Sequence, residues 1–251
     1  MRKLIDTFTQ KIGSAEIAVL MPVHNEAHTI ENVVLELYNT LGHKMPLEII
    51  LSEDGSTDYT KEKIVEISKK VPLKALLFHA RKGYAHGIID GLSLVKSEYV
   101  LITDSDGQHD PRDFWKLWEL RKEYDIVSGW RVERADSLHR KLMSKMFQFM
   151  AKTLFDLPDF KDITAPFKLM KTRIAREVAS KCKYMKESFW TEFTIRAHKM
   201  GFKIIEIPVG HRNRLGGSTR VYKLNVIPNI IFSQFIGLLK LWQEVGENED
   251  S

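Results

Sequence analysis

Continuous apolar runs alternate along the first half of the chain with segments in which apolar residues recur at helical spacing. The runs predict strands at 17–23, 47–51, 73–78 and 99–103. The segments between them predict helices at 30–41, 60–70 and 84–95. A continuous apolar run is typical of a strand that is buried on both faces. The alternation of strands with helices therefore predicts a doubly wound, mostly parallel α/β sheet.

The second half of the chain has a less regular pattern. Asp110 and Pro111 suit the cap and the first turn of a helix, so we expect a helix to begin there. Further strands are expected at 126–128, 167–170 and 202–209. Further helices are expected at 138–157, 190–200 and 228–245. The first twelve residues are charged and lack the apolar core that a signal peptide needs.

The composition is that of an ordinary folded domain. At 251 residues, of which 43% are hydrophobic and 28% are charged, the chain suits one α/β domain, or such a domain with a modest C-terminal extension. Its net charge of +5 fits either a lysine-rich surface or an anionic partner such as a phosphate, a nucleic acid or an acidic membrane. The single cysteine, Cys182, excludes an internal disulfide and a zinc site built from thiolates. Neither Gly-x-x-x-x-Gly-Lys nor Gly-x-Gly-x-x-Gly occurs, which argues against a kinase and a dehydrogenase.

Acidic and amide residues follow three of the predicted strands. The strand at 17–23 runs into His24-Asn25-Glu26, and the strand at 47–51 is followed by Glu53-Asp54-Gly55. The strand at 99–103 runs directly into the segment 104–108, which reads DSDGQ. Ligands of open parallel sheets bind beyond the carboxyl ends of the strands. We therefore expect these residues to gather at one edge of the sheet around a ligand.

The segment 104–108 offers oxygen ligands for a metal. Asp104, Asp106 and Gln108 alternate along an extended tail, and such ligands could hold Mg²⁺ or Mn²⁺. A pyrophosphate would complete the coordination, and the metal would neutralise the charge that grows on a departing nucleoside diphosphate. A turn made of aspartate and glycine is the plain structural alternative. The position directly after a buried strand favours the metal site.

The neighbouring strand ends offer groups for a nucleotide. Asp54 could accept a hydrogen bond from a nucleobase, and Asn25 and Glu26 could bind the base or the ribose. Their structural alternatives are a turn residue and helix-cap residues. The segment Arg81-Lys82-Gly83 could meet a phosphate through its charges and a close backbone approach, or form a solvated loop.

With these residues in place, the chain resembles the family 2 glycosyltransferases, which have the GT-A fold. The matching segments, in the family's order and spacing, are 21–26 (MPVHNE), 52–58 (SEDGSTD), 81–83 (RKG) and 104–108 (DSDGQ). Within that family the chain is most similar to the dolichol-phosphate mannose synthases and polyprenyl-phosphate glycosyltransferases. Gln108, Arg131 and the pair formed by Arg140 and Ser144 support this group. The segment 162–167 departs from the group's Asp…Ser-Gly-Phe pattern.

The resemblance implies a metal-dependent enzyme that inverts the anomeric centre as it moves a hexose from a GDP- or UDP-sugar to a polyprenyl or dolichyl phosphate. The implied cofactor is Mg²⁺ or Mn²⁺, with the metal ligands Asp104, Asp106 and Gln108. The implied nucleotide-sugar-binding residues are Pro22, His24, Asn25, Glu26, Asp54, Lys82, Gly83, Asp104 and Ser105. The implied catalytic residues are Asp106, Glu192 and Arg131. The arginines expected at the acceptor phosphate are Arg131, Arg140, Arg212, Arg214 and Arg220.

Two other functions stay open at this point. A phosphate acceptor is mostly dianionic at neutral pH and needs cations rather than a base. A hydroxyl acceptor on a saccharide or small molecule would need a general base, for which Glu192 is the candidate. A non-catalytic, nucleotide-binding partner subunit is the third alternative, and the intact acids at three strand ends count against it.

The resemblance also divides the chain. We expect a GT-A domain over 1–220, with a nucleotide-sugar half at about 16–130 and an acceptor half at about 131–220, followed by a helical extension over 221–251. The stretch 226–242 is too short and too polar to span a membrane. The basic amphipathic segments at 138–157 and 228–245 could rest on a membrane surface or belong to the core. The predicted location is the cytoplasm or the cytoplasmic face of the membrane. The predicted partners are the nucleotide-sugar, a polyprenyl phosphate and a membrane surface, with no nucleic acid.

Overall fold

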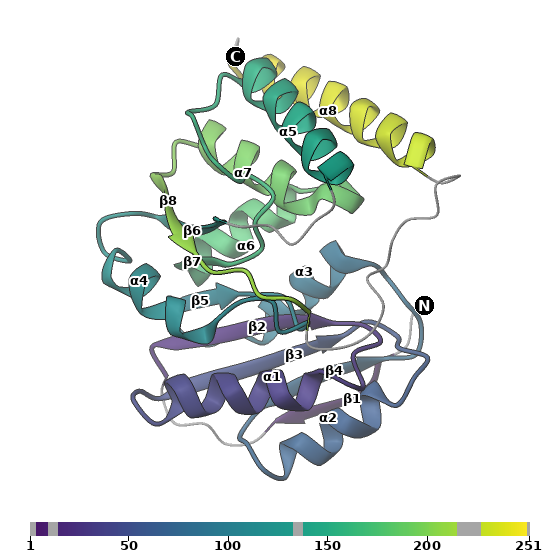
Figure 1. The fold of residues 1–251 in the computed structure, drawn as a ribbon, viewed down its shortest axis with the longest axis vertical. Coiled ribbons are helices and arrows are strands. Elements are labelled where there is room, and N and C mark those ends of the chain that lie inside the picture. Colours follow the sequence, from purple (N-terminus) through teal and green to yellow (C-terminus); the bar gives the residue numbers. More distant parts are fainter. Residues whose placement is uncertain (1–3, 10–14, 133–137, 215–226, 250–251) are drawn as a thin grey trace.

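The computed structural model describes the backbone of residues 4–9, 15–132, 138–214 and 227–249 (Figure 1). Side chains are described within 15–132, 144–214 and 232–246.

A central sheet runs through the molecule, and the described residues give it eight strands in the order β1-β4-β3-β2-β5-β7-β6-β8. The strands are β1 (Leu4–Thr9), β2 (Ile17–Val23), β3 (Leu47–Glu53), β4 (Lys74–Phe78), β5 (Tyr99–Ile102), β6 (Ile126–Arg131), β7 (Lys168–Lys171) and β8 (Ile204–Val209). Strands β4, β3, β2 and β5 are parallel to one another, and β6 is parallel to β8. Strand β1 pairs antiparallel with β4, and β7 pairs antiparallel with both β5 and β6.

Helices cover both faces of this sheet (Figure 1). They are α1 (Ile30–Leu37), α2 (Thr60–Ser68), α3 (Tyr84–Leu94), α4 (Phe114–Glu119), α5 (Leu138–Phe155), α6 (Thr172–Lys181), α7 (Phe189–Lys199) and α8 (Ile227–Glu249). One turn of π-helix, Tyr38–Gly42, extends α1, and a 3-10 turn, Pro111–Asp113, precedes α4. Asp110 caps that turn, as predicted, because its carboxylate accepts a hydrogen bond from the Arg112 amide at 2.9 Å.

The core lies on both sides of the sheet, which explains the continuous apolar runs. In β2, Ile17, Val19 and Met21 pack in one cluster with side chains of α1, α2 and α4. The alternate residues Ala18 and Leu20 pack in a second cluster with side chains of α3, α6 and α7. Because successive side chains of a strand point to opposite faces, a strand that is covered on both faces needs apolar residues throughout. The predicted doubly wound α/β fold is confirmed.

The two long helices α5 and α8 lie side by side against α7 and form a third cluster (Figure 1). Phe155 of α5 and Leu238 and Leu241 of α8 are buried there. Other large apolar side chains of the same helices are exposed: Met146, Phe149, Met150, Phe232, Phe235 and Trp242. Each helix therefore contributes one face to the core and presents a second apolar face to solvent. Among the described residues, no helix is long and apolar enough to span a bilayer.

Three features of the fold were not predicted. Strand β1 lies within a charged N-terminal segment, and an edge strand with one neighbour does not need a two-sided apolar pattern. Helix α6 buries Ile174, Ala175, Val178 and Ala179, a helical spacing that the sequence does contain. Strand β7 runs against its neighbours, and its direction depends on tertiary structure rather than on its own four residues.

Candidate active site

A cleft of about 200 Å³ opens where the parallel strands β2, β3 and β5 end. Its lining residues are Pro22, Val23, His24, Glu26, Asp54, Arg81, Tyr84, Gly87, Asp104, Ser105, Asp106 and Arg214. The structure thus brings most of the predicted nucleotide-sugar-binding residues to one edge of the sheet. Parallel strands make this possible because their carboxyl ends meet at that edge.

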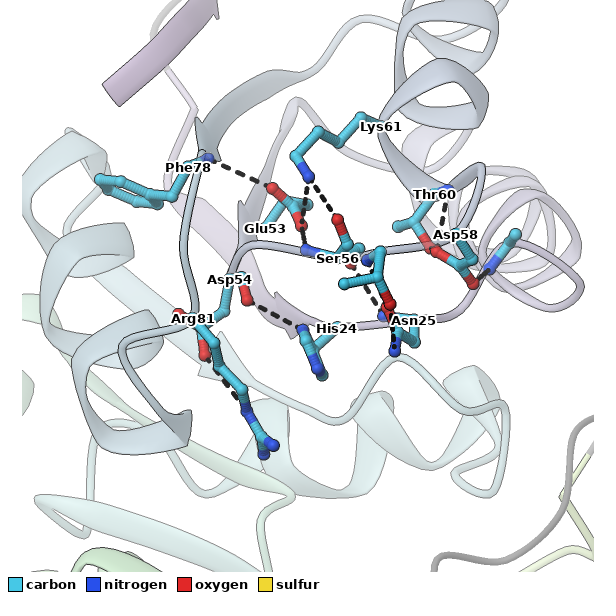
Figure 2. A network of polar contacts seen from close by, with 12 residues as sticks. His24, Asn25, Glu53, Asp54, Ser56, Asp58, Thr60, Lys61, Phe78 and Arg81 are labelled. Carbon is cyan, nitrogen blue, oxygen red and sulfur yellow. Dashed lines mark hydrogen bonds and ion pairs between the residues drawn. The ribbon is translucent and has the colours of Figure 1, made fainter. Parts of the chain in front are cut away.

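The loops after β2 and β3 are fastened to each other (Figure 2). Asn25 has a positive φ of 54°, and its side-chain oxygen accepts a hydrogen bond from the Thr57 amide at 2.8 Å. Its own amide donates to the Ser56 hydroxyl at 2.8 Å. The His24 ring N–H donates to the backbone carbonyl of Asp54 at 2.8 Å. Asn25 does not line the cleft, so the structure gives it a role in holding the loops together.

Asp54 fixes the entry to α3. Its carboxylate is buried and accepts hydrogen bonds from the amides of Lys82, at 2.5 Å, and Gly83, at 2.8 Å. Gly83 has a φ of 102°, a conformation that glycine adopts without steric cost. The Lys82 ammonium pairs with Asp90 and lies 3.2 Å from the centre of the Phe78 ring, and Lys82 does not line the cleft.

Arg81, rather than Lys82, brings positive charge to this side of the cleft. Its guanidinium Nε lies 4.0 Å from the Asp54 carboxylate, and its side chain is 59% exposed (Figure 2). The sequence motif contained both cations, but it could not say which of them faces the cleft.

Asp104, the first aspartate after β5, lies beside two aromatic side chains. Tyr84, the first residue of α3, donates from its hydroxyl to Asp104 at 2.7 Å, and the Trp190 indole N–H donates to the same hydroxyl at 2.8 Å. Burial, together with the negative charge of Asp106, raises the pKa of Asp104 to about 7. Neither Tyr84 nor Trp190 was predicted as a site residue, because an aromatic residue at either position fits the ordinary core pattern of a helix.

The rest of the tail after β5 is held by the backbone around it. The Ser105 hydroxyl donates to the Pro22 carbonyl at 2.9 Å, which ties this tail to the end of β2. The Gln108 side-chain amide donates to the Arg212 carbonyl at 3.3 Å, and its backbone amide donates to Asp106 at 3.1 Å. Gln108 does not line the cleft, whereas Asp104 and Asp106 do. Within the described residues, no group of three or more His, Cys, Asp or Glu side chains is placed to hold a metal ion.

Of the arginines predicted at an acceptor phosphate, Arg214 lines the cleft, where it bonds to Glu26 and lies 3.8 Å from Asp106. Arg131, at the end of β6, makes two hydrogen bonds to Asp162, at 2.7 and 3.1 Å. Arg212 pairs with Glu36 at 2.7 Å and with Asp110 at 2.6 Å. The side chains of Arg140 and Arg220 lie outside the described residues.

Glu192 is buried at the start of α7 and does not line this cleft. Its carboxylate accepts hydrogen bonds from the amides of Lys183, Tyr184 and Met185 at 2.8–2.9 Å. It also pairs with Arg196 at 2.9 Å. Four donors around one carboxylate hold the turn before α7 in place.

Solved structures share this fold. Glucosyl-3-phosphoglycerate synthase from Mycobacterium tuberculosis, solved with Mn²⁺, UDP and phosphoglyceric acid, aligns over 91% of this chain and 78% of its own, with a TM-score of 0.64 and 17% identity. A mannosyltransferase from Pyrobaculum calidifontis in complex with GDP-Man and Mn²⁺ aligns over 84% of this chain and 59% of its own, with a TM-score of 0.56 and 21% identity. The fold is therefore of the GT-A type.

Sequence comparison gives the family. A profile of glycosyl transferase family 2 matches residues 18–179, and the chain belongs to this family. It is 29% identical over 217 residues to an undecaprenyl-phosphate 4-deoxy-4-formamido-L-arabinose transferase from Pectobacterium carotovorum, covering 84% of this chain and 64% of the relative. It is also 29% identical over 157 residues to a dolichol-phosphate mannosyltransferase from Pyrococcus furiosus, covering 60% of this chain and 44% of the relative. The chain thus spans less than two thirds of the length of each of these relatives. The names of the relatives confirm the expected likeness to the polyprenyl-phosphate group.

Proposed function

We propose that this chain is a metal-dependent, inverting glycosyltransferase that moves a hexose from a GDP- or UDP-sugar to a polyprenyl or dolichyl phosphate. The observation that carries the proposal is the cleft at the ends of β2, β3 and β5, where Asp104 and Asp106 lie near cationic side chains. The names of the family 2 relatives, which act on undecaprenyl phosphate or dolichol phosphate, support the acceptor.

The cleft suits a divalent ion. Burial and the neighbouring Asp106 disfavour the ionised form of Asp104, and a cation between hard-oxygen carboxylates would stabilise that form. Asp104 and Asp106 would hold Mg²⁺ or Mn²⁺, with the diphosphate supplying further oxygens, and the ion would stabilise the negative charge of the leaving diphosphate. Gln108 lies next to the cleft and would support Asp106 through its backbone amide.

The residues around the cleft suit a phosphate acceptor better than a hydroxyl acceptor. In a direct displacement, a phosphate oxygen would form the new bond to the anomeric carbon as the bond to the diphosphate breaks. A dianionic phosphate needs no base, and Glu192 already accepts four hydrogen bonds away from the cleft. Arg214 in the cleft and Arg131 beside it would supply positive charge.

The proposed acceptor carries a long apolar chain, and the exposed apolar faces of α5 and α8 offer a surface for a membrane that contains it. Both helices also carry lysines, among them Lys145 and Lys240, which suit anionic lipid headgroups. These features support a peripheral position on a membrane, and we propose that this is the cytoplasmic face.

The proposal is tested by transfer of labelled sugar. The protein is incubated with a panel of GDP- and UDP-sugars, with Mg²⁺ or Mn²⁺ and with a polyprenyl phosphate, and label that enters the lipid phase is counted. We expect one donor to label the lipid, and we expect Asp106→Ala to abolish labelling while the circular dichroism spectrum is retained. Asp159→Ala, which changes an exposed acid whose partners are Lys152 and Lys161, is the control and should keep full activity. Undiminished turnover by Asp106→Ala would remove the metal-dependent mechanism.

A further inference from the structure

Arg214 connects parts of the chain that are remote in sequence. It lies five residues after the end of β8, and its guanidinium reaches Glu26 beyond β2 and Asp106 beyond β5. The contact to Glu26 is a hydrogen bond, and one guanidinium nitrogen lies 3.8 Å from an Asp106 oxygen. The side chain is only 24% exposed.

Glu26, the hydrogen-bond partner of this arginine, is itself held by two further hydrogen bonds. The Glu26 carboxylate also accepts a hydrogen bond from the Thr29 hydroxyl at 2.6 Å, and the Glu26 amide donates to the Thr60 hydroxyl at 2.8 Å. The contact to Asp106 is longer and has no hydrogen bond between the two side chains. Arg214 therefore makes a hydrogen bond to Glu26 and a longer ion-pair contact to the proposed metal ligand Asp106.

We propose that Arg214 competes with the divalent ion for Asp106 and binds the diphosphate once the ion is in place. This inference rests on the proposed function, because it needs a metal at Asp106 and a nucleoside diphosphate in the cleft. A guanidinium suits both partners, since it bonds to carboxylate and phosphate oxygens with the same planar geometry.

The electrostatics give the exchange a direction. A divalent cation on Asp106 repels the guanidinium, whereas the negative charge of a diphosphate attracts it. Arg214 therefore weakens the binding of the metal alone and strengthens the binding of the metal together with a diphosphate. The consequence is that the ion and the nucleotide bind cooperatively, each raising the affinity of the cleft for the other.

The experiment compares wild type with Arg214→Gln and follows the binding of Mn²⁺ by electron paramagnetic resonance. Without nucleotide, we expect the variant to bind Mn²⁺ at least about fivefold more tightly, because one nearby positive charge has been removed. With Mn²⁺ saturating, we expect calorimetry to show GDP or UDP binding about tenfold more weakly to the variant, because a charged hydrogen bond to phosphate is lost. Effects of opposite sign cannot come from a general loosening of the fold.

Two variants control the test. Arg81→Gln removes the other arginine of the cleft, which faces Asp54, so it should weaken nucleotide binding and leave the affinity for Mn²⁺ alone unchanged. Arg214→Lys keeps the charge and should bind Mn²⁺ alone as weakly as wild type. If Arg214→Gln does not fold, Arg214→Met, which also removes the charge and keeps a long side chain, serves as the test variant with the same expected shifts. If wild type binds Mn²⁺ and nucleotide but Arg214→Gln shifts both affinities in the same direction, only this inference fails. If wild type binds neither ligand, the proposed function fails with it.

Discussion

Several polar side chains at the strand ends make hydrogen bonds to backbone amides as well as lying near the proposed ligand site. Asp54 and Asn25 carry the polar groups that a nucleotide site needs, yet both bond to backbone amides of neighbouring loops. Asp104 differs, because its carboxylate accepts a hydrogen bond from a side chain, the hydroxyl of Tyr84. A buried acid of this kind has an energetic cost that depends on pH.

The cost at Asp104 predicts how stability changes with pH. The pKa of Asp104 is about 7 in the folded chain and 3.8 without perturbation, so the folded chain binds this proton more tightly than the unfolded chain. Its contribution to stability is full below about pH 4 and is lost as the pH rises through 7. Asp104→Asn removes this loss, and we expect a Tm above that of wild type at pH 8, by roughly 2–4 °C for each kcal/mol regained, and an equal Tm near pH 4.

Calorimetry with a chelator present, at pH 4 and pH 8, measures both values. A variant whose Tm differs from wild type by the same amount at both pH values would show that Asp104 does not titrate in this range.

Helices and strands with strong patterns were predictable, whereas side-chain contacts between distant elements were not. The run that forms β2 is buried on both faces, and the spacing of Ile30, Val33, Val34 and Leu37 gave α1 within a few residues. Most of the cleft residues could be predicted as well, because motifs after parallel strands converge at one edge. Tyr84 and Trp190 could not be predicted, since their hydrogen bonds join α3 to α7 across 106 residues of sequence.

The start of α7 gives a prediction about Glu192. Glu192→Gln leaves one side-chain oxygen to accept and points an N–H₂ group at backbone donors, so we expect a loss of about 1–3 kcal/mol in the free energy of unfolding. Transfer to a polyprenyl phosphate, measured per folded molecule, should fall less than tenfold. A fall of roughly 10²–10⁴-fold with the fold intact would instead identify Glu192 as a general base and favour a hydroxyl acceptor.

Most of the large exposed apolar side chains among the described residues lie on one pair of helices, α5 and α8. Phe149 is 69% exposed on α5, and Phe232 is 66% exposed on α8, which lies beside it (Figure 1). Large exposed apolar surfaces of soluble proteins commonly mark contacts with a membrane or a protein.

This surface predicts binding to vesicles. We expect the protein to sediment with vesicles of phosphatidylcholine and phosphatidylglycerol, and the double variant Phe149→Ser, Phe232→Ser to bind at least about tenfold more weakly, since burial of one phenylalanine is worth about 1.5–3 kcal/mol. Tyr59→Ser is the matched control, because Tyr59 is 76% exposed but precedes α2, far from these helices. Equal sedimentation of all three proteins would exclude this surface as the membrane contact.

The reversed strand β7 has a consequence for where the later strands of the sheet end. It is antiparallel to β5 on one side and to β6 on the other, and two reversals restore the original direction. Strands β6 and β8 therefore end at the same rim as β2, β3 and β5, although they come much later in the chain. If β7 were antiparallel to β5 but parallel to β6, then β6 and β8 would end at the opposite rim. Because the two reversals cancel, the segment after β8, which carries Arg214, can reach the carboxylates that follow β2 and β5.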